Sequence, residues 1–335
     1  MPSRPLHCAV IGLGVGQRLA EAIAAREDCS LVALCDIDPG KLASAKERFP
    51  QAAVTTRDAD ILDDDSVDMV CIASYDNYHF AQTRQALLNG KHVFVEKPFV
   101  LYEQEAREIR ALLGQRPGCR LSSNLVLRTV PRFRDLKRRI EGGELGQLFH
   151  LEGDYDYGRL AKIVDGWRGR LPFYSAVHGG GVHIADLLMW LAQDRVEEVS
   201  AYGNAIASAG SSFANFDMVV AALRFRGGAV GKLGVNFGCV RPHFHRLQVY
   251  GTSATFENRP DAALLYTSRE AAAAPAALAT DYPGHDKALV VGSFIDSLWG
   301  SAEMVTTEDV FAAMSVCFAI ERSAHEGRPV RVDYI

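Results

Sequence analysis

The stretch Cys8-Ala-Val-Ile-Gly-Leu-Gly-Val-Gly16 decides the fold of this chain. Four apolar residues form a short strand, the glycine-rich turn Gly12-x-Gly14-x-Gly16 follows, and a helix is predicted over 17–26. The first glycine allows a tight turn, the second lets a pyrophosphate approach the backbone, and the helix N-terminal amides hold the phosphate. Gln17 stands where the third glycine usually is, so the motif is irregular, but the strand before it and the helix after it are its required context.

The next predicted strand, 30–36, ends at a carboxylate, Asp36. A carboxylate at this place binds the adenosine ribose diol and repels a 2′-phosphate, so we expect NAD rather than NADP. The alternatives are a simple strand-end carboxylate for Asp36 and a structural helix-start role for His79. The residues expected to bind the cofactor are Gly12, Gly14, Val15, Gly16, Asp36, Ala73, Ser74, His79, Glu96 and Lys97.

Strands and helices alternate through the first third of the chain. The expected elements are strands at 67–73 and 92–96 and helices at 39–49, 79–89 and 102–113. Short strands without a polar face indicate a parallel sheet that helices cover on both sides. Right-handed crossovers then give a doubly wound Rossmann domain, which we place at residues 1–122.

The pattern changes after Arg120. We expect helices at 131–142, 181–191, 287–299 and 307–326, strands at 198–203, 218–225, 229–237 and 246–251, and a surface excursion at 271–283. Arg224-Phe-Arg-Gly-Gly-Ala229 indicates a hairpin. Because consecutive strands follow without helices between them, residues 123–335 are predicted to form an α+β domain with a mostly antiparallel sheet.

The composition argues against several classes of function. Of 335 residues, 48% are hydrophobic and 23% charged, as in an ordinary globular protein. A net charge of −5 argues against nucleic acid as a partner. No apolar run reaches the ~18 residues that a membrane span needs, and the N-terminus has no signal-peptide core. Seven cysteines without a C-x-x-C pair indicate reduced, buried thiols, and we expect a cytoplasmic protein.

The tripeptide Glu96-Lys97-Pro98 stands at the exit of the strand 92–96, in the same predicted sheet as the glycine turn. Oxidation of an alcohol requires a base near the oxygen while hydride leaves the carbon. A lysine can act as this base if burial and a nearby cation lower its pKa. We therefore predict nicotinamide-dependent redox chemistry with Lys97 as acid/base. The alternative is a surface lysine ion-paired to Glu96.

At these positions the chain resembles the Gfo/Idh/MocA oxidoreductases, the family of glucose–fructose oxidoreductase and inositol dehydrogenase. The resemblance runs through most of the chain and rests on the order and spacing of short motifs. Besides the glycine turn and Glu96-Lys97-Pro98, these are Ala73-Ser-Tyr-Asp-Asn-Tyr-His79, Arg128-x-x-Pro131, Trp167-Arg168, His183-x-x-Asp186 and Tyr250-Gly251-Thr252.

The resemblance implies that the second domain binds substrate and carries a large open sheet, which often serves as an oligomer interface, so we expect a homodimer or homotetramer. It also implies sugars, cyclitols or their derivatives as substrates, with Lys97 and His183 as the catalytic pair beside the carbinol. The expected substrate-binding residues are Lys97, Arg128, Arg159, Lys162, Trp167, Arg168, His178 and His183. Alternatives are a packed or capping role for His183 and a structural bond for Asp186, one turn later.

One departure from the family concerns its motif Asp-x-Gly-x-His. Gly179 stands where the aspartate is common, and the neighbouring His178 could take part of its role. Three functions stay open: an oxidoreductase for a carbinol or ketone, which we expect, an NAD-dependent glycosidase with transient oxidation, and a non-catalytic NAD-binding sensor.

Other charged and histidine residues each have two interpretations. Arg159 and Lys162 could bind the carboxylate or phosphate of an acidic sugar or sugar nucleotide, or be solvated loop charges. The basic helix at 131–142 is interpreted as a solvated face rather than a nucleic-acid site. His243 and His245 point to one side of a strand but lack a third ligand, so we predict pocket or structural roles and no metal.

Overall fold

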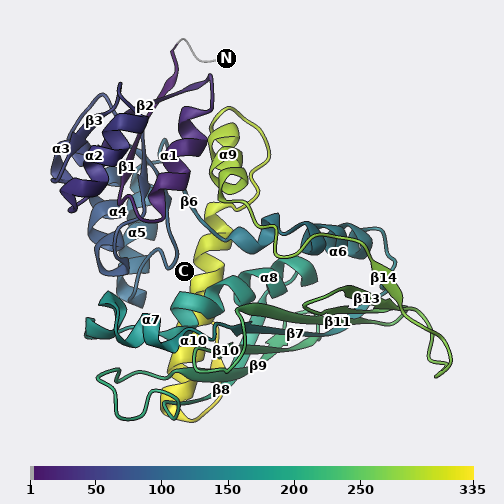
Figure 1. Ribbon diagram of the computed structural model, residues 1–335. Coiled ribbons are helices and arrows are strands. Elements are labelled where there is room, and N and C mark those ends of the chain that lie inside the picture. The colour runs from purple at the N-terminus through teal and green to yellow at the C-terminus, as the bar shows by residue number, and fades with distance from the viewer. Residues whose placement is uncertain (1–3) are drawn as a thin grey trace. The chain divides into compact units, whose positions relative to one another are not determined.

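The computed structural model describes residues 4–335, which divide into two compact units (Figure 1). The Rossmann unit comprises the chain to residue 125, the returning segment Asp286–Phe311, and Ile335. The sheet unit comprises Val126–His285 and Ala312–Tyr334. The predicted fold class, a parallel Rossmann sheet and a mostly antiparallel second sheet, is confirmed.

The Rossmann unit is built on six parallel strands in the order β3-β2-β1-β4-β5-β6. Their bounds are β1 (Leu6–Ile11), β2 (Cys29–Cys35), β3 (Ala53–Thr55), β4 (Met69–Ile72), β5 (His92–Val95) and β6 (Leu121–Ser123). Cys8, Cys35 and Cys71 lie buried in β1, β2 and β4, as expected. The strand order reverses between β1 and β4, and in doubly wound sheets ligands bind at the carboxyl ends of such strands.

Helices of this unit bury one apolar stripe each against the sheet or a neighbour. They are α1 (Gly16–Ala24), α2 (Pro39–Arg48), α3 (Ala59–Leu62), α4 (His79–Leu88), α5 (Glu103–Gln115) and α9 (Lys287–Leu298). In α1 the residues Leu19, Ala20 and Ile23 are fully buried, at the spacing of one helix face. Helix α9 of the returning segment packs beside α1 (Figure 1).

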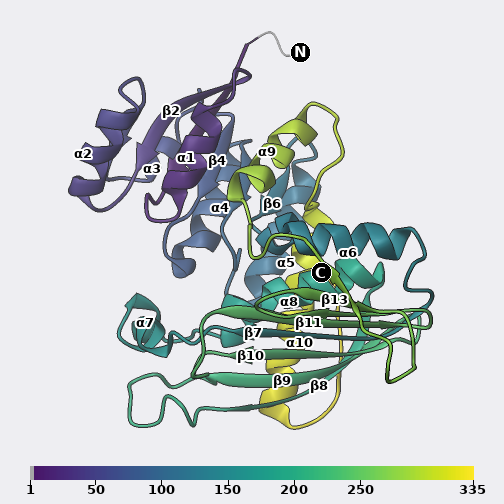
Figure 2. The ribbon, with the colours of Figure 1, turned by 45° about the vertical axis from the view of Figure 1, so that its right-hand side comes forward.

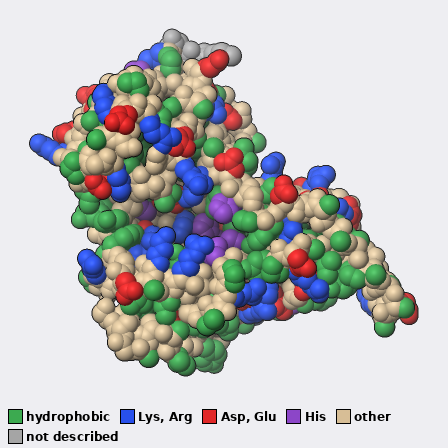
Figure 3. Space-filling view, viewed as in Figure 1, with side chains coloured by type: hydrophobic (Ala, Val, Ile, Leu, Met, Phe, Trp, Pro, Cys, Tyr) green, Lys and Arg blue, Asp and Glu red, His purple; other side chains and the backbone are tan. Residues whose placement is uncertain are grey.

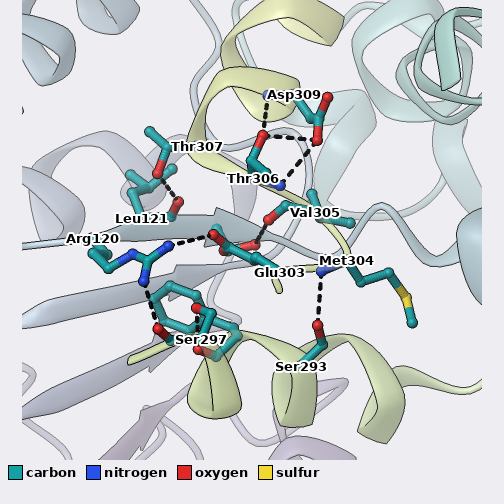
Figure 4. Close-up of polar contacts among 12 residues, drawn as sticks. Arg120, Leu121, Ser293, Ser297, Glu303, Met304, Val305, Thr306, Thr307 and Asp309 are labelled. Carbon is teal, nitrogen blue, oxygen red and sulfur yellow. Dashed lines mark hydrogen bonds and ion pairs between the residues drawn. The ribbon is translucent and has the colours of Figure 1, made fainter. Parts of the chain in front are cut away.

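Polar contacts bind the returning segment to the edge strand β6 (Figure 4). The Arg120 guanidinium donates to the Ser297 carbonyl at 2.7 Å and pairs with the Glu303 carboxylate at 3.0 Å. The Ser122 hydroxyl donates to the Val305 carbonyl at 2.7 Å. A segment from late in the chain thus completes the Rossmann unit.

The sheet unit contains nine strands in the order β14-β13-β12-β11-β7-β10-β9-β8-β15. Their bounds are β7 (Leu148–Asp156), β8 (Val196–Asn204), β9 (Met218–Phe225), β10 (Val230–Asn236), β11 (Phe244–Gly251), β12 (Thr255–Asn258), β13 (Ala263–Tyr266), β14 (Ala276–Leu278) and β15 (Val330–Arg331). Within this sheet, among the described residues, β7 and β10 pair in parallel and all other neighbouring strands pair antiparallel. The predicted hairpin joins β9 to β10, with Gly228 at φ 93°.

One face of this sheet is covered by helices and the other is open (Figure 2). The helices of the unit include α6 (Pro131–Glu141), α7 (Leu160–Val164), α8 (Val182–Ala192) and the C-terminal part of α10 (Thr307–Glu326). Helix α8 approaches β7 so closely that a Cβ on Gly153 would lie 2.5 Å from an Ile184 methyl. Along β9, buried Val219, Ala221 and Leu223 alternate with outward-facing residues, as expected for a one-sided sheet.

Across residues 4–335, no helix combines the length and the apolar character needed to traverse a lipid bilayer. On the face that Figure 3 shows, acidic and basic side chains are interspersed over the Rossmann unit.

Candidate cofactor and substrate sites

The glycine turn after β1 lies against the backbone that follows β4. Gly12 has φ 90°, and a Cβ there would lie 2.5 Å from the Ser74 nitrogen, so only glycine fits. A Cβ on Gly14, in contrast, would meet no other described atom within 4 Å. The backbone at Gly14 is therefore open in front of the α1 N-terminus, where helix amides favour a phosphate.

Asp36 is buried and holds this turn in place. One carboxylate oxygen accepts from the Leu13 amide at 2.6 Å, and the other accepts from the Asp38 amide at 2.9 Å. Lys41 Nζ lies 3.3 Å from the first oxygen, a contact that the sequence analysis did not identify. Because each carboxylate oxygen has more than one acceptor site, capacity for ribose hydroxyls remains. The structural and the cofactor-binding interpretations of Asp36 are therefore compatible.

These residues fit a dinucleotide. The open backbone at Gly14 can receive the pyrophosphate, and the buried carboxylate of Asp36 stands at the end of β2, next to β1. Val15 precedes the first turn of α1 and is 44% exposed, in keeping with a position beside a ligand. The expected cofactor residues of this turn are thus brought together at the strand-order reversal.

Glu96, which precedes Lys97, is anchored from the returning segment. Its buried carboxylate accepts from Lys287 Nζ at 2.8 Å and from the Asn124 amide at 2.7 Å. Burial alone would raise the pKa of Glu96, but Lys287 and the other donors outweigh it and lower the pKa. Glu96 thus fixes the carboxyl end of β5, and Lys97 follows it half-buried. Lys287 lies far away in sequence, and no local pattern indicated this partner.

His79 joins the two turns that follow β4 and β5. It is fully buried, with Nδ1 2.7 Å from the Pro98 carbonyl oxygen and Nε2 3.2 Å from the Ser74 carbonyl oxygen. Both ring nitrogens therefore face backbone oxygens. This geometry makes His79 a positioning residue that links the Ala73-Ser74 backbone to the Lys97-Pro98 turn.

Arg128 and Asp186 form a buried, bidentate ion pair in the sheet unit. The nitrogen–oxygen distances are 3.0 and 2.6 Å, and the side chains are 6% and 2% exposed. Removal of one partner from such a pair leaves a buried charge, which typically costs about 3–5 kcal/mol. The pair fixes α8, the helix that carries His183, and so gives Asp186 a structural bond.

His183, near the start of α8, lies in a group of aromatic and histidine rings. The Tyr155 ring of β7 stacks on it at 6.0 Å and also contacts His243 at 4.8 Å and His245 at 5.3 Å. His245 Nδ1 lies 2.9 Å from the Tyr282 hydroxyl oxygen, and burial lowers the pKa of His245 well below its usual value. Within the described residues no group of three His, Cys, Asp or Glu side chains could hold a metal.

His178 lies in the core of the sheet unit. Its ring contacts Phe173 at 5.7 Å and Phe318 at 5.2 Å, both edge-on, and it is 2% exposed. Neither ring nitrogen has a hydrogen-bond partner among residues 4–335, and burial lowers its pKa to about 3. These contacts favour a packing role over the substrate contact that the sequence suggested.

The cationic side chains of the loop between β7 and α8 differ in exposure and in their contacts with aromatic rings. Arg168 stacks on Trp167 at 4.3 Å and lies 5.5 Å from the Tyr174 ring centre. Arg159 lies over Tyr157 at 5.6 Å, and its side chain is exposed. Lys162 is exposed on α7. Arg168 is therefore the cation that this loop holds most firmly against the aromatic rings.

Both halves of the chain match models of known protein families. Residues 6–124 match the model of the Oxidoreductase family, NAD-binding Rossmann fold. Residues 133–257 match that of the GFO/IDH/MocA C-terminal domain. Together the two matches cover well over half of the chain.

Individual relatives agree with this placement. The uncharacterized oxidoreductase YhhX of Escherichia coli is 34% identical over 138 residues, 41% of this chain and only 39% of that protein's length. The scyllo-inositol 2-dehydrogenase (NAD(+)) of Bacillus subtilis is 24% identical over 259 residues, 75% of this chain and 72% of the relative.

A solved structure shows the same fold. The WlbA dehydrogenase from Bordetella pertussis, in complex with NADH and UDP-GlcNAcA, superposes with a TM-score of 0.82 at 23% identity, over 99% of this chain and 100% of that chain. With two consecutive family matches and this fold, the chain belongs to the GFO/IDH/MocA family of NAD-binding oxidoreductases.

Proposed function

We propose that this protein is an NAD-dependent oxidoreductase that transfers hydride between nicotinamide and a secondary carbinol or ketone of a sugar, cyclitol or sugar derivative. The observation that carries the proposal is the half-buried Lys97 at the carboxyl end of β5, in the same unit as the Gly12–Gly16 turn and Asp36. Family membership and the likeness to scyllo-inositol 2-dehydrogenase support it.

Separate groups of residues would bind the cofactor and transfer the proton. The backbone at Gly14 and the α1 amides hold the pyrophosphate, and Asp36 accepts from the ribose hydroxyls. Bound NAD supplies the hydride acceptor. Lys97 accepts the proton of the substrate hydroxyl during oxidation and donates it to the ketone in the reverse direction. Glu96 is already held by Lys287 and Asn124, so it anchors the turn rather than relaying the proton.

For the substrate we propose an acidic sugar or a sugar nucleotide, which His183 helps to orient. Arg168, stacked on Trp167 beside Tyr174, is a guanidinium suited to a carboxylate or phosphate. The likeness in fold to a protein bound to UDP-GlcNAcA supports this class.

A substrate panel tests the function. NADH formation is measured by absorbance with myo-inositol, D-glucose, D-glucuronate, UDP-glucose and UDP-glucuronate. Net NADH with any of these supports the dehydrogenase, and preference for the acidic members supports the substrate class. Release of a chromogenic aglycone without added NAD would indicate the glycosidase instead. Retained NAD binding without either activity would indicate a sensor.

Lys97→Ala tests the acid/base directly. We expect turnover to fall by ~10²-fold or more, since positioned acid/base groups contribute ~10²–10⁴-fold, while the Kd for NAD changes far less because the glycine turn and Asp36 are intact. Lys97→Arg keeps the charge but cannot release its proton, so it should be similarly impaired. Lys46→Ala, which removes a lysine that binds only backbone carbonyls, is the control. Normal turnover of Lys97→Ala would exclude Lys97 as the acid/base.

We also propose that the open face of the nine-stranded sheet forms a homodimer or homotetramer interface. On this face Tyr202, Val220 and Val230 are 72%, 36% and 51% exposed. The charges beside them are already paired, because Asp154 holds both Lys232 and Arg246. Exposed apolar residues bordered by ion-paired polar groups are typical of association surfaces.

A further inference from the structure

In the turn before His183, tyrosine rings fill the space that side chains at Gly179 and Gly180 would need. In the buried π-helical turn Val177–Gly181, a Cβ on Gly179 would overlap the Tyr174 hydroxyl and lie 2.8 Å from its Cζ. A Cβ on Gly180 would lie 2.5 Å from the Tyr155 ring. Real Cβ atoms do not approach heavy atoms this closely, so a tyrosine in the position of Tyr174 requires glycine at 179.

Tyr174 is firmly held in this position. It is 2% exposed, its ring stacks on Phe237 at 6.3 Å with an interplanar angle of 26°, and Arg168 lies 5.5 Å from the ring centre. Its hydroxyl cannot swing away from Gly179 without breaking these contacts. The phenol therefore occupies the place of a side chain at 179.

The Tyr174 hydroxyl, which fills the space of a side chain at 179, lies close to His183 along the helix. Gly179 precedes His183 by about one helical turn, so the Tyr174 hydroxyl lies near the helix face that carries His183. A carboxylate at 179 would place a negative charge there and repel an anionic substrate. The phenol brings no carboxylate to this position, and the Arg168 guanidinium lies 5.5 Å from its ring centre.

We propose that Tyr174 is a specificity-determining residue: by replacing a side chain at 179 with a neutral phenol next to Arg168, it selects substrates that carry a carboxylate or phosphate. This proposal rests on the proposed oxidoreductase function. A purely structural role for Tyr174 predicts a different result, because loss of packing lowers activity on acidic and neutral substrates alike.

The steric exchange is tested by thermal unfolding of four full-length proteins. Gly179→Asp alone should lower Tm because its Cβ collides with Tyr174, and Tyr174→Leu alone should lower Tm by leaving a cavity. The double variant Tyr174→Leu/Gly179→Asp should recover part of the loss. Its decrease in Tm should be smaller than the sum of the decreases in the two single variants. Tyr334→Leu, which removes another buried tyrosine, bound to the Val196 carbonyl, is the control and should give no recovery with Gly179→Asp.

The specificity is tested with the matched pairs D-glucuronate/D-glucose and UDP-glucuronate/UDP-glucose. We expect the natural protein to favour the acidic member and the double variant to lower the acidic-to-neutral ratio of kcat/KM by about ten-fold or more. Tyr174→Phe, which keeps the ring and adds no charge, should largely keep the ratio.

Two outcomes overturn this proposal: an unchanged ratio in a folded double variant, or a natural preference for the neutral members. Absence of NADH with every panel member, while NAD still binds, would instead refute the proposed function, and the specificity would fall with it. The Tm series would still decide whether Tyr174 and Gly179 exclude each other.

Discussion

At the scale of single residues, Asp36 combines two tasks. It accepts from the Leu13 amide inside the glycine turn and stands where the cofactor ribose is expected. Lys41 lies 3.3 Å away, so the carboxylate also neutralises a cation. We therefore expect the preference for NAD over NADP to depend on a carboxylate that masks a neighbouring lysine.

Replacement of Asp36 by alanine tests this arrangement. We expect NAD to bind about 10–100-fold more weakly, because hydrogen bonds to a charged group contribute about 1.5–3 kcal/mol. Discrimination against NADP should relax, since Lys41 is then available to a 2′-phosphate. Fluorescence titrations with both cofactors measure the change.

The control is Asp36→Asn, which keeps an oxygen acceptor for the Leu13 amide. If the altered preference arises from the unmasked cation, Asp36→Ala/Lys41→Ala should lose the gain in NADP affinity. An unchanged ratio of NAD to NADP affinity in Asp36→Ala would refute the ribose role.

At the scale of elements, the carboxyl group of Glu303, between β6 and the returning segment, has a raised pKa. Glu303 has a side chain only 4% exposed, and burial raises its pKa to about 7 despite the opposing effects of Arg120 and Ser122 (Figure 4). In the unfolded chain a glutamate titrates near 4.5. Between these values the folded state binds a proton that the unfolded state releases, so Glu303 makes stability fall as pH rises through about 7.

Glu303→Gln should remove this dependence. We expect the free energy of unfolding of the natural protein to fall relative to the variant by about 1–3 kcal/mol between pH 5 and pH 8, at about 1.36 kcal/mol for each pKa unit. Urea unfolding across this range measures it. Glu308→Gln, an exposed change in the same segment, is the control. Parallel pH profiles for the natural protein and Glu303→Gln would contradict the assignment.

At the scale of the whole molecule, each unit is completed by chain that lies far away in sequence. The returning segment follows nearly all of the sheet unit in sequence, yet supplies α9, Lys287 and Glu303 to the Rossmann unit. We propose that the open sheet face is covered by a second copy of the chain.

Two acidic substitutions on that face test the association. Tyr202→Glu/Val220→Glu places charges on neighbouring strands and should shift the protein towards monomer, because unpaired carboxylates are costly to bury. Light scattering after size exclusion measures the mass. Ile206→Glu, a change outside the strands at a residue about as exposed as Tyr202, should leave the mass unchanged. A monomeric natural protein, or a double variant of unchanged mass, would refute the proposed interface.

Local patterns in the sequence predicted the elements that have a regular period or a special residue. The helix expected at 307–326 is α10, because its apolar period is unbroken over five turns' length, and the hairpin before Val230 follows from Gly227-Gly228. The central strand β7 was not predicted, since Gly153 and its acidic residues interrupt the apolar alternation. Its charge Asp154 is stabilised by cations on both neighbouring strands, which only the folded sheet brings near.

The sequence by itself therefore determined the Rossmann fold, the cofactor turn and the choice of Lys97 as candidate acid/base, because these depend on short local patterns and on their order along the chain. Only the tertiary structure decided that Glu96 pairs with Lys287, that Arg128 pairs with Asp186, and that the Tyr174 phenol fills the space at Gly179. The physical reason is that such partners are selected by packing and by burial of charge, which depend on distances in space and leave no periodic trace along the chain.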